Sequence, residues 1–256
     1  MPVSTQQKCL NMENVHPLAN GELGEAFTKT QVWIFDLDNT LYPSKINLFK
    51  QIDQRMGAFI AKELGVPIAY ARHLQKSYYH QFGTTLAGLM KVHGVDPISF
   101  LDYVHDIDLS CVPDHPRLRR GIDALPGRKL IFTNGARGHA ERVAARLGVL
   151  DLFEDICSIE SNAFIPKPSR EAFMKMVQNH DVAPSNAAMF EDLPHNLEMA
   201  HALGMKTILV MSGYMDHPAQ KNITAWRQLP AHVHFLTDDL AGFLYDGWVE
   251  ISDETP

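Results

Sequence analysis

The sequence lacks the features that mark several broad classes of protein. It has no apolar run approaching the length of a membrane span, and residues 1–20 are polar, without the apolar centre of a secretory signal. Lys and Arg form no long run, and the formal net charge is -7, the sign opposite to the one that a polyanion attracts. We therefore expect a cytoplasmic protein that binds no nucleic acid polymer and no membrane.

Cysteine is also scarce. The three cysteines, Cys9, Cys111 and Cys157, lie far apart and form no C-x-x-C pair. This pattern argues against a disulfide framework and a structural zinc site, and it is typical of a reducing compartment. The 13 histidines show no H-E-x-x-H or comparable ligand spacing, so most are expected to be surface or structural residues.

The chain does contain alternating strand and helix patterns, interrupted by a purely helical block. Residues 1–30 show no sustained periodicity and are expected to form a poorly ordered leader. The apolar run at 32–35 is typical of a strand buried on both faces, whereas residues 44–113 repeat apolar positions at helical spacing. The expected strands are 32–35, 128–133, 155–159, 186–190, 206–211 and 232–236, and the expected helices are 48–64, 69–82, 86–93, 97–104, 136–147, 169–179, 195–203 and 237–245.

This order predicts an α/β fold: a doubly wound, Rossmann-like parallel sheet with an inserted all-helical cap domain. The core domain would comprise residues 31–43 and 114–256, and the cap domain residues 44–113.

Polar residues follow the strands of this expected core at the points where ligands bind in open parallel sheets. They are Asp36, Asp38, Thr133, Asn134, Lys167, Glu191 and Asp192. Several carboxylates at one point repel each other unless a cation neutralises them, and oxygen ligands without His or Cys select Mg²⁺. A hydroxyl, main-chain amides and an ammonium would bind the remaining oxygens of a phosphoryl group. The set therefore predicts metal-assisted phosphoryl transfer.

Two of the aspartates would divide the chemistry. Asp36 would attack phosphorus and form an aspartyl-phosphate, while Asp38 would protonate the leaving oxygen and then activate water. Each motif alone has a plainer explanation, since D-x-D often caps a turn and a loop lysine is usually solvated. The prediction depends on all of them meeting at one edge of the sheet.

Four segments resemble, in order, the four motifs of the haloacid dehalogenase superfamily of phosphatases. They are FDLDNTLY at 35–42, IFTNG at 131–135, PKP at 166–168 and FEDLPHN at 190–196, and the resemblance runs from residue 31 to about residue 211. It implies an aspartyl-phosphate intermediate and a helical cap that closes over the site and selects the substrate.

The resemblance also implies a set of ligands. Mg²⁺ would be held by the Asp36 carboxylate, the Asp38 main-chain carbonyl and the Asp192 carboxylate. Thr133, Asn134 and Lys167 match the phosphate-binding positions. Position 191 is Glu where many relatives have Asp or Gly, so Glu191 is expected, like Thr40, to lie around the metal ligands rather than on the metal. The roles of Glu191 and Asp192 could be reversed.

A narrower resemblance is to the pyrimidine 5′-nucleotidase branch. It depends on FDLDNTLYP, on the run YHQFGTTLAGLM at 79–90, and on VHDIDLS at 104–110. The substrate would be a small phosphate ester, namely a nucleoside 5′-monophosphate with UMP or CMP preferred. The alternatives are another phosphate ester such as a sugar phosphate or pyridoxal phosphate, a mutase or dehalogenase, and a catalytically silent binding module. The sequence leaves open whether the protein is a monomer or a homodimer.

Substrate specificity is expected to come from the cap. Tyr79 and Phe82 could stack on a base, and Thr84 could hydrogen-bond to its edge, although such aromatic residues more often form the cap's own core. Further candidates, each with an equally plain structural explanation, are Tyr78, Thr85, Phe49, Arg55, Met56, Arg137 and His139.

Overall fold

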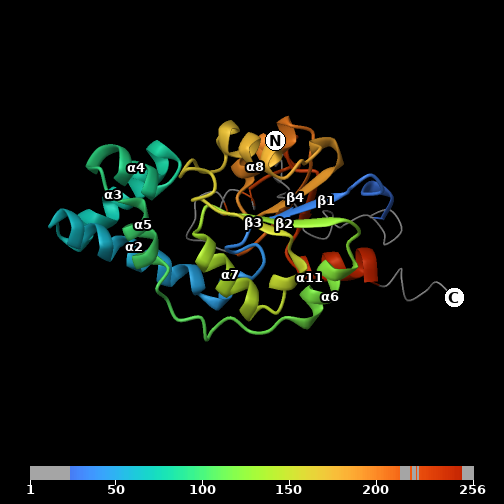
Figure 1. The fold of residues 1–256 in the computed structure, drawn as a ribbon, viewed down its shortest axis with the longest axis horizontal. Coiled ribbons are helices and arrows are strands. Elements are labelled where there is room, and N and C mark those ends of the chain that lie inside the picture. The colour runs from blue at the N-terminus through green and yellow to red at the C-terminus, as the bar shows by residue number, and fades with distance from the viewer. Residues whose placement is uncertain (1–23, 214–219, 221–222, 224, 250–256) are drawn as a thin grey trace, which may run out of the picture.

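The computed structural model describes residues 24–213, 220, 223 and 225–249, and its centre is a six-stranded sheet (Figure 1). The strands are β1 (Val32–Phe35), β2 (Arg128–Phe132), β3 (Asp155–Cys157), β4 (Ala187–Glu191), β5 (Lys206–Val210) and β6 (Phe235–Thr237). They are arranged in the order β3-β2-β1-β4-β5-β6, and every pairing is parallel. β1 therefore lies in the middle of the sheet, next to β2 and β4.

Helices cover both faces of the sheet, as expected for a doubly wound fold. On one face lie α6 (Pro116–Ala124), α7 (Arg137–Arg146) and α11 (Leu240–Leu244), and on the other lie α8 (Arg170–Asn179) and α9 (Pro194–Ala202). The alternation of strand side chains produces both cores: Trp33 and Phe35 of β1 pack in the first, and Val32 and Ile34 in the second. All four side chains are buried, which explains the uninterrupted apolar run.

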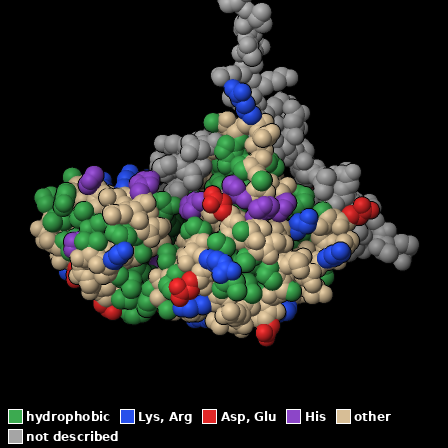
Figure 2. Space-filling view, turned by 90° about the horizontal axis from the view of Figure 1, so that it is seen from above, with side chains coloured by type: hydrophobic (Ala, Val, Ile, Leu, Met, Phe, Trp, Pro, Cys, Tyr) green, Lys and Arg blue, Asp and Glu red, His purple; other side chains and the backbone are tan. Residues whose placement is uncertain are grey.

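Four helices between β1 and α6 form a separate lobe at one end of the sheet (Figure 1). They are α2 (Leu48–Leu64), α3 (Ile68–Phe82), α4 (Thr85–His93) and α5 (Pro97–Val104). They share a hydrophobic cluster of their own, into which Ile159 of the core also packs. Hydrophobic side chains also lie on the lobe's surface, as Figure 2 shows at the left. This arrangement supports the proposal that residues 44–113 form a cap.

The remaining regular segments are short. Single 3₁₀ turns lie at Ser44–Ile46, Leu150–Leu152 and Pro184–Asn186, and a π-helical segment, Tyr245–Val249, follows α11. No helix among the described residues has both the length and the hydrophobicity needed to cross a membrane.

The fold class predicted from the sequence is confirmed, but several local expectations were wrong. Helix α6 was not predicted, although Pro116 at its first position and the His115 side chain at its N-cap are ordinary start signals. The last strand begins at Phe235 rather than residue 232, and the helix after it is capped by Asp239 rather than by Thr237.

The expected leader at 1–30 is only partly testable. Residues 1–23 lie outside the described residues, but Phe27 is 3% exposed and packs against Trp33 and Trp248. The packed core therefore begins before residue 31. The sequence did not indicate this, because a single buried aromatic residue gives no periodic signal.

Candidate functional site

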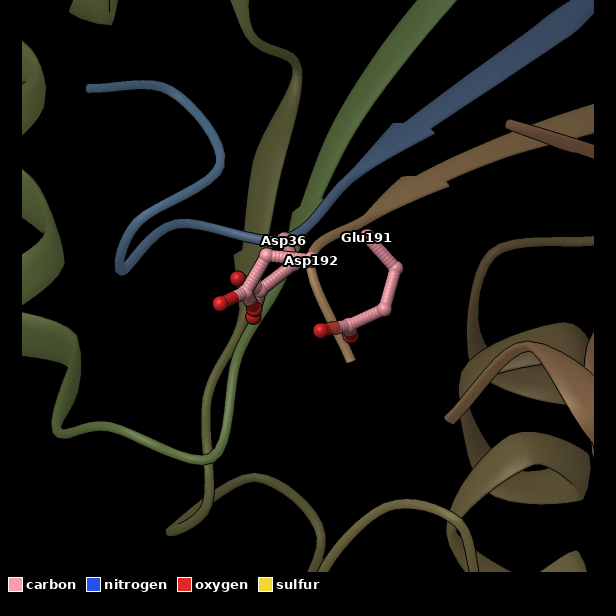
Figure 3. A group of neighbouring side chains, drawn as sticks. All are labelled: Asp36, Glu191 and Asp192. Atoms are coloured by element: carbon pink, nitrogen blue, oxygen red, sulfur yellow. The ribbon is translucent and has the colours of Figure 1, made fainter. Parts of the chain in front are cut away.

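Three carboxylates meet where β1 and β4 end (Figure 3). The register pairs Phe35 with Phe190, and the Asp36 N–H donates to the Phe190 carbonyl at 2.9 Å, so Asp36 lies beside the end of β4. One carboxylate oxygen from each of Asp36, Glu191 and Asp192 falls within 4.8 Å of the others, and all three residues are buried. Parallel neighbouring strands thus bring together acidic groups that are far apart in the sequence.

Lys167 is the cation of this group. Its Nζ donates at 2.7 Å to Asp36 Oδ1, to Glu191 Oε2 and to the Phe132 carbonyl, and the residue is 1% exposed. Asn134 fixes the loop that carries it, because its side chain accepts from the Lys167 N–H at 2.8 Å and donates to the Lys167 carbonyl at 3.2 Å. We call Asp36, Lys167, Glu191 and Asp192 the lysine cluster.

The lysine cluster has more negative than positive charge when all its groups are ionised. Burial, and then repulsion by Glu191, raise the pKa of Asp36 to about 7, although Lys167 opposes this shift. Burial, Glu191 and Asp36 likewise raise the pKa of Asp192 well above its ordinary value. The Asp192 carboxylate also accepts from Ser212 Oγ at 3.4 Å, and its main-chain carbonyl accepts from the Gln220 side chain. The cluster therefore favours taking up a cation or a proton.

Asp38, two residues after Asp36, belongs to a different group. Its Oδ1 accepts from the Tyr42 hydroxyl at 2.5 Å and lies 2.9 Å from His139 Nε2. The His139 ring is stacked on that of His105, with centroids 4.4 Å apart and planes 18° apart. We call Asp38, Tyr42, His105 and His139 the histidine cluster.

The electrostatics of the histidine cluster are opposite to those of the lysine cluster. Burial by itself raises the pKa of Asp38, but the charge and hydrogen bond of His139, with the Tyr42 hydroxyl, hold that pKa below its ordinary value. Burial, followed by repulsion from His139, lowers the pKa of His105 to about 3. Asp38 is thus an ionised carboxylate supplied with donors, and His105 is neutral.

The loop after β2 lies beside both clusters. Thr133 Oγ1 accepts from the Gly135 N–H at 2.9 Å. A Cβ at Gly135 would lie 3.2 Å from Thr133 Oγ1 and 3.4 Å from Asp38 Oδ2, so only glycine fits there without a shift. Thr40 is 3% exposed, and its Oγ1 has no hydrogen-bond partner among the described residues.

The structure separates the candidate cap residues. The Tyr79 hydroxyl lies 3.5 Å from His195 Nε2 at the start of α9, and burial together with Asp192 and Glu191 raises the pKa of Tyr79. Tyr79 therefore faces the acidic end of the sheet. Phe82, by contrast, packs in the cap's cluster, and Thr84 caps α4 by accepting from the Ala87 N–H.

Most of the remaining candidates are explained by local structure. The Arg137 guanidinium donates to Asp155 at 2.8 Å and to the Ile156 carbonyl at 2.5 Å, so it is held beside β3 at the start of α7. Phe49 and Met56 pack against the cap's cluster, and Arg55 pairs with Asp106. Of the two neighbours considered after the second motif, only His139 reaches a carboxylate of the site.

Sequence reasoning did not identify Tyr42 and His105 as members of this site. Tyr42 lies within the first motif, four residues after Asp38, in a turn that brings its hydroxyl to the Asp38 carboxylate. His105 comes from the end of α5, so its approach to His139 depends on how the cap docks and has no local sequence signal.

Comparison with known proteins gives one family. A family model described as haloacid dehalogenase-like hydrolase matches residues 30–204. Phosphate metabolism protein 8 of Saccharomyces cerevisiae is 30% identical over 211 residues, which is 76% of this chain but only 65% of that protein, so the chain spans about two thirds of its length.

Two solved structures share the fold. The L-2-haloacid dehalogenase PA0810 superposes with a TM-score of 0.53 at 15% identity, covering 84% of this chain and 98% of that one. A HAD phosphatase from Thermococcus onnurineus superposes with a TM-score of 0.53 at 15% identity, covering 83% and 95%. One is a dehalogenase and the other a phosphatase, so the shared fold does not distinguish these chemistries.

Proposed function

The chain belongs to the haloacid dehalogenase-like hydrolases, and from that membership we propose that it is a Mg²⁺-dependent phosphatase with Asp36 as its nucleophile. The observation that carries this proposal is the lysine cluster, in which a buried ammonium lies 2.7 Å from two of three buried carboxylates. The name of the yeast relative, which refers to phosphate metabolism, supports the same chemistry.

A divalent cation fits the donor set. Three carboxylates and one ammonium leave a charge of 2− when all are ionised, and Mg²⁺ would neutralise it. The donors are all oxygens, as this ion prefers. Asp36, Asp192 and the Asp38 main-chain carbonyl would hold the ion, which when bound would neutralise charge on the phosphoryl oxygens. Glu191 is kept in place by Lys167 at 2.7 Å and by the Leu193 N–H at 3.2 Å, so we assign it to orienting Lys167.

The protein's own residues then divide the work. Asp36 attacks phosphorus, and the bond from phosphorus to the ester oxygen breaks as that oxygen takes a proton that Asp38 has first taken up from solvent. Asp38 next removes a proton from water, which attacks phosphorus and releases Asp36. Lys167 and the Thr133–Gly135 loop neutralise and hold the phosphoryl oxygens.

The substrate we propose is a nucleoside 5′-monophosphate, with a pyrimidine base preferred. The support is the resemblance of the cap sequence and the position of Tyr79, whose ring is carried by α3 and whose hydroxyl lies near the start of α9. A sugar phosphate or pyridoxal phosphate would use the same site with different cap contacts.

The test is phosphate release from a panel of UMP, CMP, dUMP, AMP, GMP, pyridoxal phosphate and sugar phosphates, with Mg²⁺ and with excess chelator. We expect chelator-sensitive release that is fastest with UMP and CMP. Release centred on a sugar phosphate would keep the phosphatase and overturn the nucleotide specificity. Failure to release phosphate from any member, together with metal-independent halide release from a 2-haloacid, would overturn the phosphatase in favour of a dehalogenase.

A further inference from the structure

His139 is buried beside the proposed acid–base carboxylate. It is 1% exposed, on the first turn of α7, and its Nε2 lies 2.9 Å from Asp38 Oδ1. The motif resemblance assigns it no role, and none of the proposed catalytic steps uses it.

The hydrogen-bond network determines which way this contact runs. Asp38 Oδ1 already accepts from the Tyr42 hydroxyl, and it is an acceptor both in the carboxylate and when the acid proton lies on Oδ2. His139 Nε2 must therefore carry the hydrogen and donate it, an assignment made from the network. The Oδ1 atom thus receives two hydrogen bonds from buried donors.

The orientation of His139 has an energetic cost. The other ring nitrogen, Nδ1, is buried with no hydrogen-bond partner among the described residues. Leaving such an atom unsatisfied costs about 1–3 kcal/mol. A purely apolar side chain would avoid that cost while filling the same space against His105. The hydrogen bond to Asp38 is what the imidazole adds.

The second oxygen of Asp38 faces the site. Asp38 Oδ2 lies 3.4 Å from the position of a Cβ at Gly135, beside Thr133 Oγ1. The Thr133–Gly135 loop is the proposed phosphate-binding loop. Since both donors hold Oδ1, the carboxylate cannot rotate without losing two hydrogen bonds, and Oδ2 is left facing that loop.

We propose that His139 is a positioning residue that, together with Tyr42, fixes Asp38 so that Oδ2 delivers and receives the proton in catalysis. This inference rests on the proposed phosphatase function. Before the first step Oδ2 takes up a proton from solvent, which leaves Oδ1 as the acceptor of both hydrogen bonds. Oδ2 then gives that proton to the ester oxygen, which keeps the electron pair of the broken phosphorus–oxygen bond. In the second step Oδ2 takes a proton from the attacking water.

Leaving-group dependence tests this role, because a structural defect slows all esters alike. An alkyl phosphate needs a proton on its leaving oxygen, whereas the nitrophenolate of p-nitrophenyl phosphate leaves without one. We compare kcat/KM, which depends on the phosphorylation of Asp36 and not on the later hydrolysis step that both esters share. For His139→Ala we expect kcat/KM for the fastest alkyl ester of the panel to fall about 10–100-fold. With p-nitrophenyl phosphate we expect kcat/KM to change less than about threefold.

Three further variants make the test specific. His139→Gln places an amide N–H near the Nε2 position and should restore much of the alkyl-ester rate. Tyr42→Phe removes the other hydrogen-bond donor to Oδ1 and should also slow the alkyl ester more than p-nitrophenyl phosphate. This variant keeps the test available if His139→Ala does not fold. His105→Ala removes a buried ring from the same stack but leaves the Asp38 contact available, so it should not change the ratio of the two rates.

The outcomes separate the two proposals. Selective loss with the alkyl ester, restored by Gln, supports the positioning role. Equal loss with both esters, or no loss, in His139→Ala and Tyr42→Phe overturns it while the phosphatase stands. A wild-type protein that hydrolyses neither ester overturns the proposed function, and the inference with it.

Discussion

The lysine cluster and the histidine cluster contain aspartates only two residues apart, yet their surroundings act on those aspartates in opposite directions. Asp36 shares buried space with two further carboxylates, and burial with Glu191 raises its pKa to about 7. Asp38 is buried as well, but the pKa of this carboxyl stays below its ordinary value because His139 and Tyr42 donate to it. Burial is common to both, so the partners account for the difference.

This contrast shows how one short loop can supply two different chemical roles. Carboxyl groups whose environments shift their pKa values apart are the usual sign of divided roles in an active site. The lysine cluster has a net negative charge when all its groups are ionised, which suits a metal ion, and its one ammonium suits a phosphoryl group. The histidine cluster has its donors in place already, which suits a carboxylate that must keep one orientation.

Asp36→Asn is the strongest test of the division. If Asp36 is the nucleophile, turnover should fall about 10⁴-fold or more, because an amide neither attacks phosphorus nor binds the cation well. Phosphate release from the best substrate of the panel measures this. The metal-free variant should unfold at a higher temperature than the wild type, because one repelling carboxylate is gone; full activity would end the covalent mechanism.

Lys167→Met tests whether the lysine cluster depends on its one ammonium. Removing it leaves buried carboxylates uncompensated, so we expect the metal-free protein to lose about 3–5 kcal/mol of unfolding free energy in urea titrations. Lys175→Met is the matched control, because Lys175 forms only a surface pair with Glu171 at 3.5 Å and should change stability by less than about 0.5 kcal/mol. Equal losses in the two variants would contradict the assigned role of Lys167.

The two clusters differ in how far the sequence predicted them. Asp36, Lys167 and Asp192 were predicted to meet because each follows a strand or precedes a helix, and parallel pairing brings such ends together. The doubly wound α/β fold class followed from the alternation of strand and helix patterns. Asn134 stays a predicted phosphate-binding residue. The hydrogen bonds of its side chain to the Lys167 backbone depend on loop geometry and had no signal in the sequence.

The histidine cluster was largely missed for the same reason. The approach of His105 to His139 depends on how α5 packs against α7. The spacing of apolar residues in a sequence does not predict how one domain packs against another. The sequence also did not determine which face of α3 lies toward the core, and so it did not predict that Tyr79 lies near the start of α9. Helical spacing identifies an apolar stripe, but it does not say which polar residue at its border turns toward a neighbouring domain.

Asp192→Asn and Glu191→Gln sharpen the comparison within the lysine cluster. If Asp192 is the direct ligand, Asp192→Asn should weaken Mg²⁺ binding about 10–100-fold, and Glu191→Gln should weaken it less. Isothermal titration with Mg²⁺ measures both affinities without any turnover. A larger loss of Mg²⁺ affinity in Glu191→Gln than in Asp192→Asn would make Glu191 the direct ligand and would assign to Asp192 the role of orienting Lys167.

The pH dependence of metal binding follows from the raised pKa of Asp36. In the metal-free protein Asp36 keeps a proton up to about pH 7 that the unfolded chain releases near its ordinary pKa of 3.8. Stability from this group is therefore full at low pH and declines as pH rises toward 7. Mg²⁺ must displace that proton, so its affinity should rise up to about tenfold per pH unit between about pH 5 and 7. Asp36→Asn should reduce the slope to the part that comes from Asp192, whose pKa is also raised; an unchanged slope in that variant would place the displaced proton elsewhere.

Tyr79→Phe should have the smallest effect on activity. It tests whether the cap contacts the substrate through a residue that lies near the lysine cluster. The hydroxyl lies 3.5 Å from His195 and close enough to Asp192 and Glu191 to have its pKa raised by them. If it hydrogen-bonds to the substrate, KM should rise about 2–10-fold with little change in kcat, which is the range expected for one lost hydrogen bond. Tyr70→Phe is the control, because Tyr70 is carried by the same helix but is 52% exposed. A KM that is unchanged in both variants would mean that α3 only covers the site, and that the two clusters of the core set specificity without it.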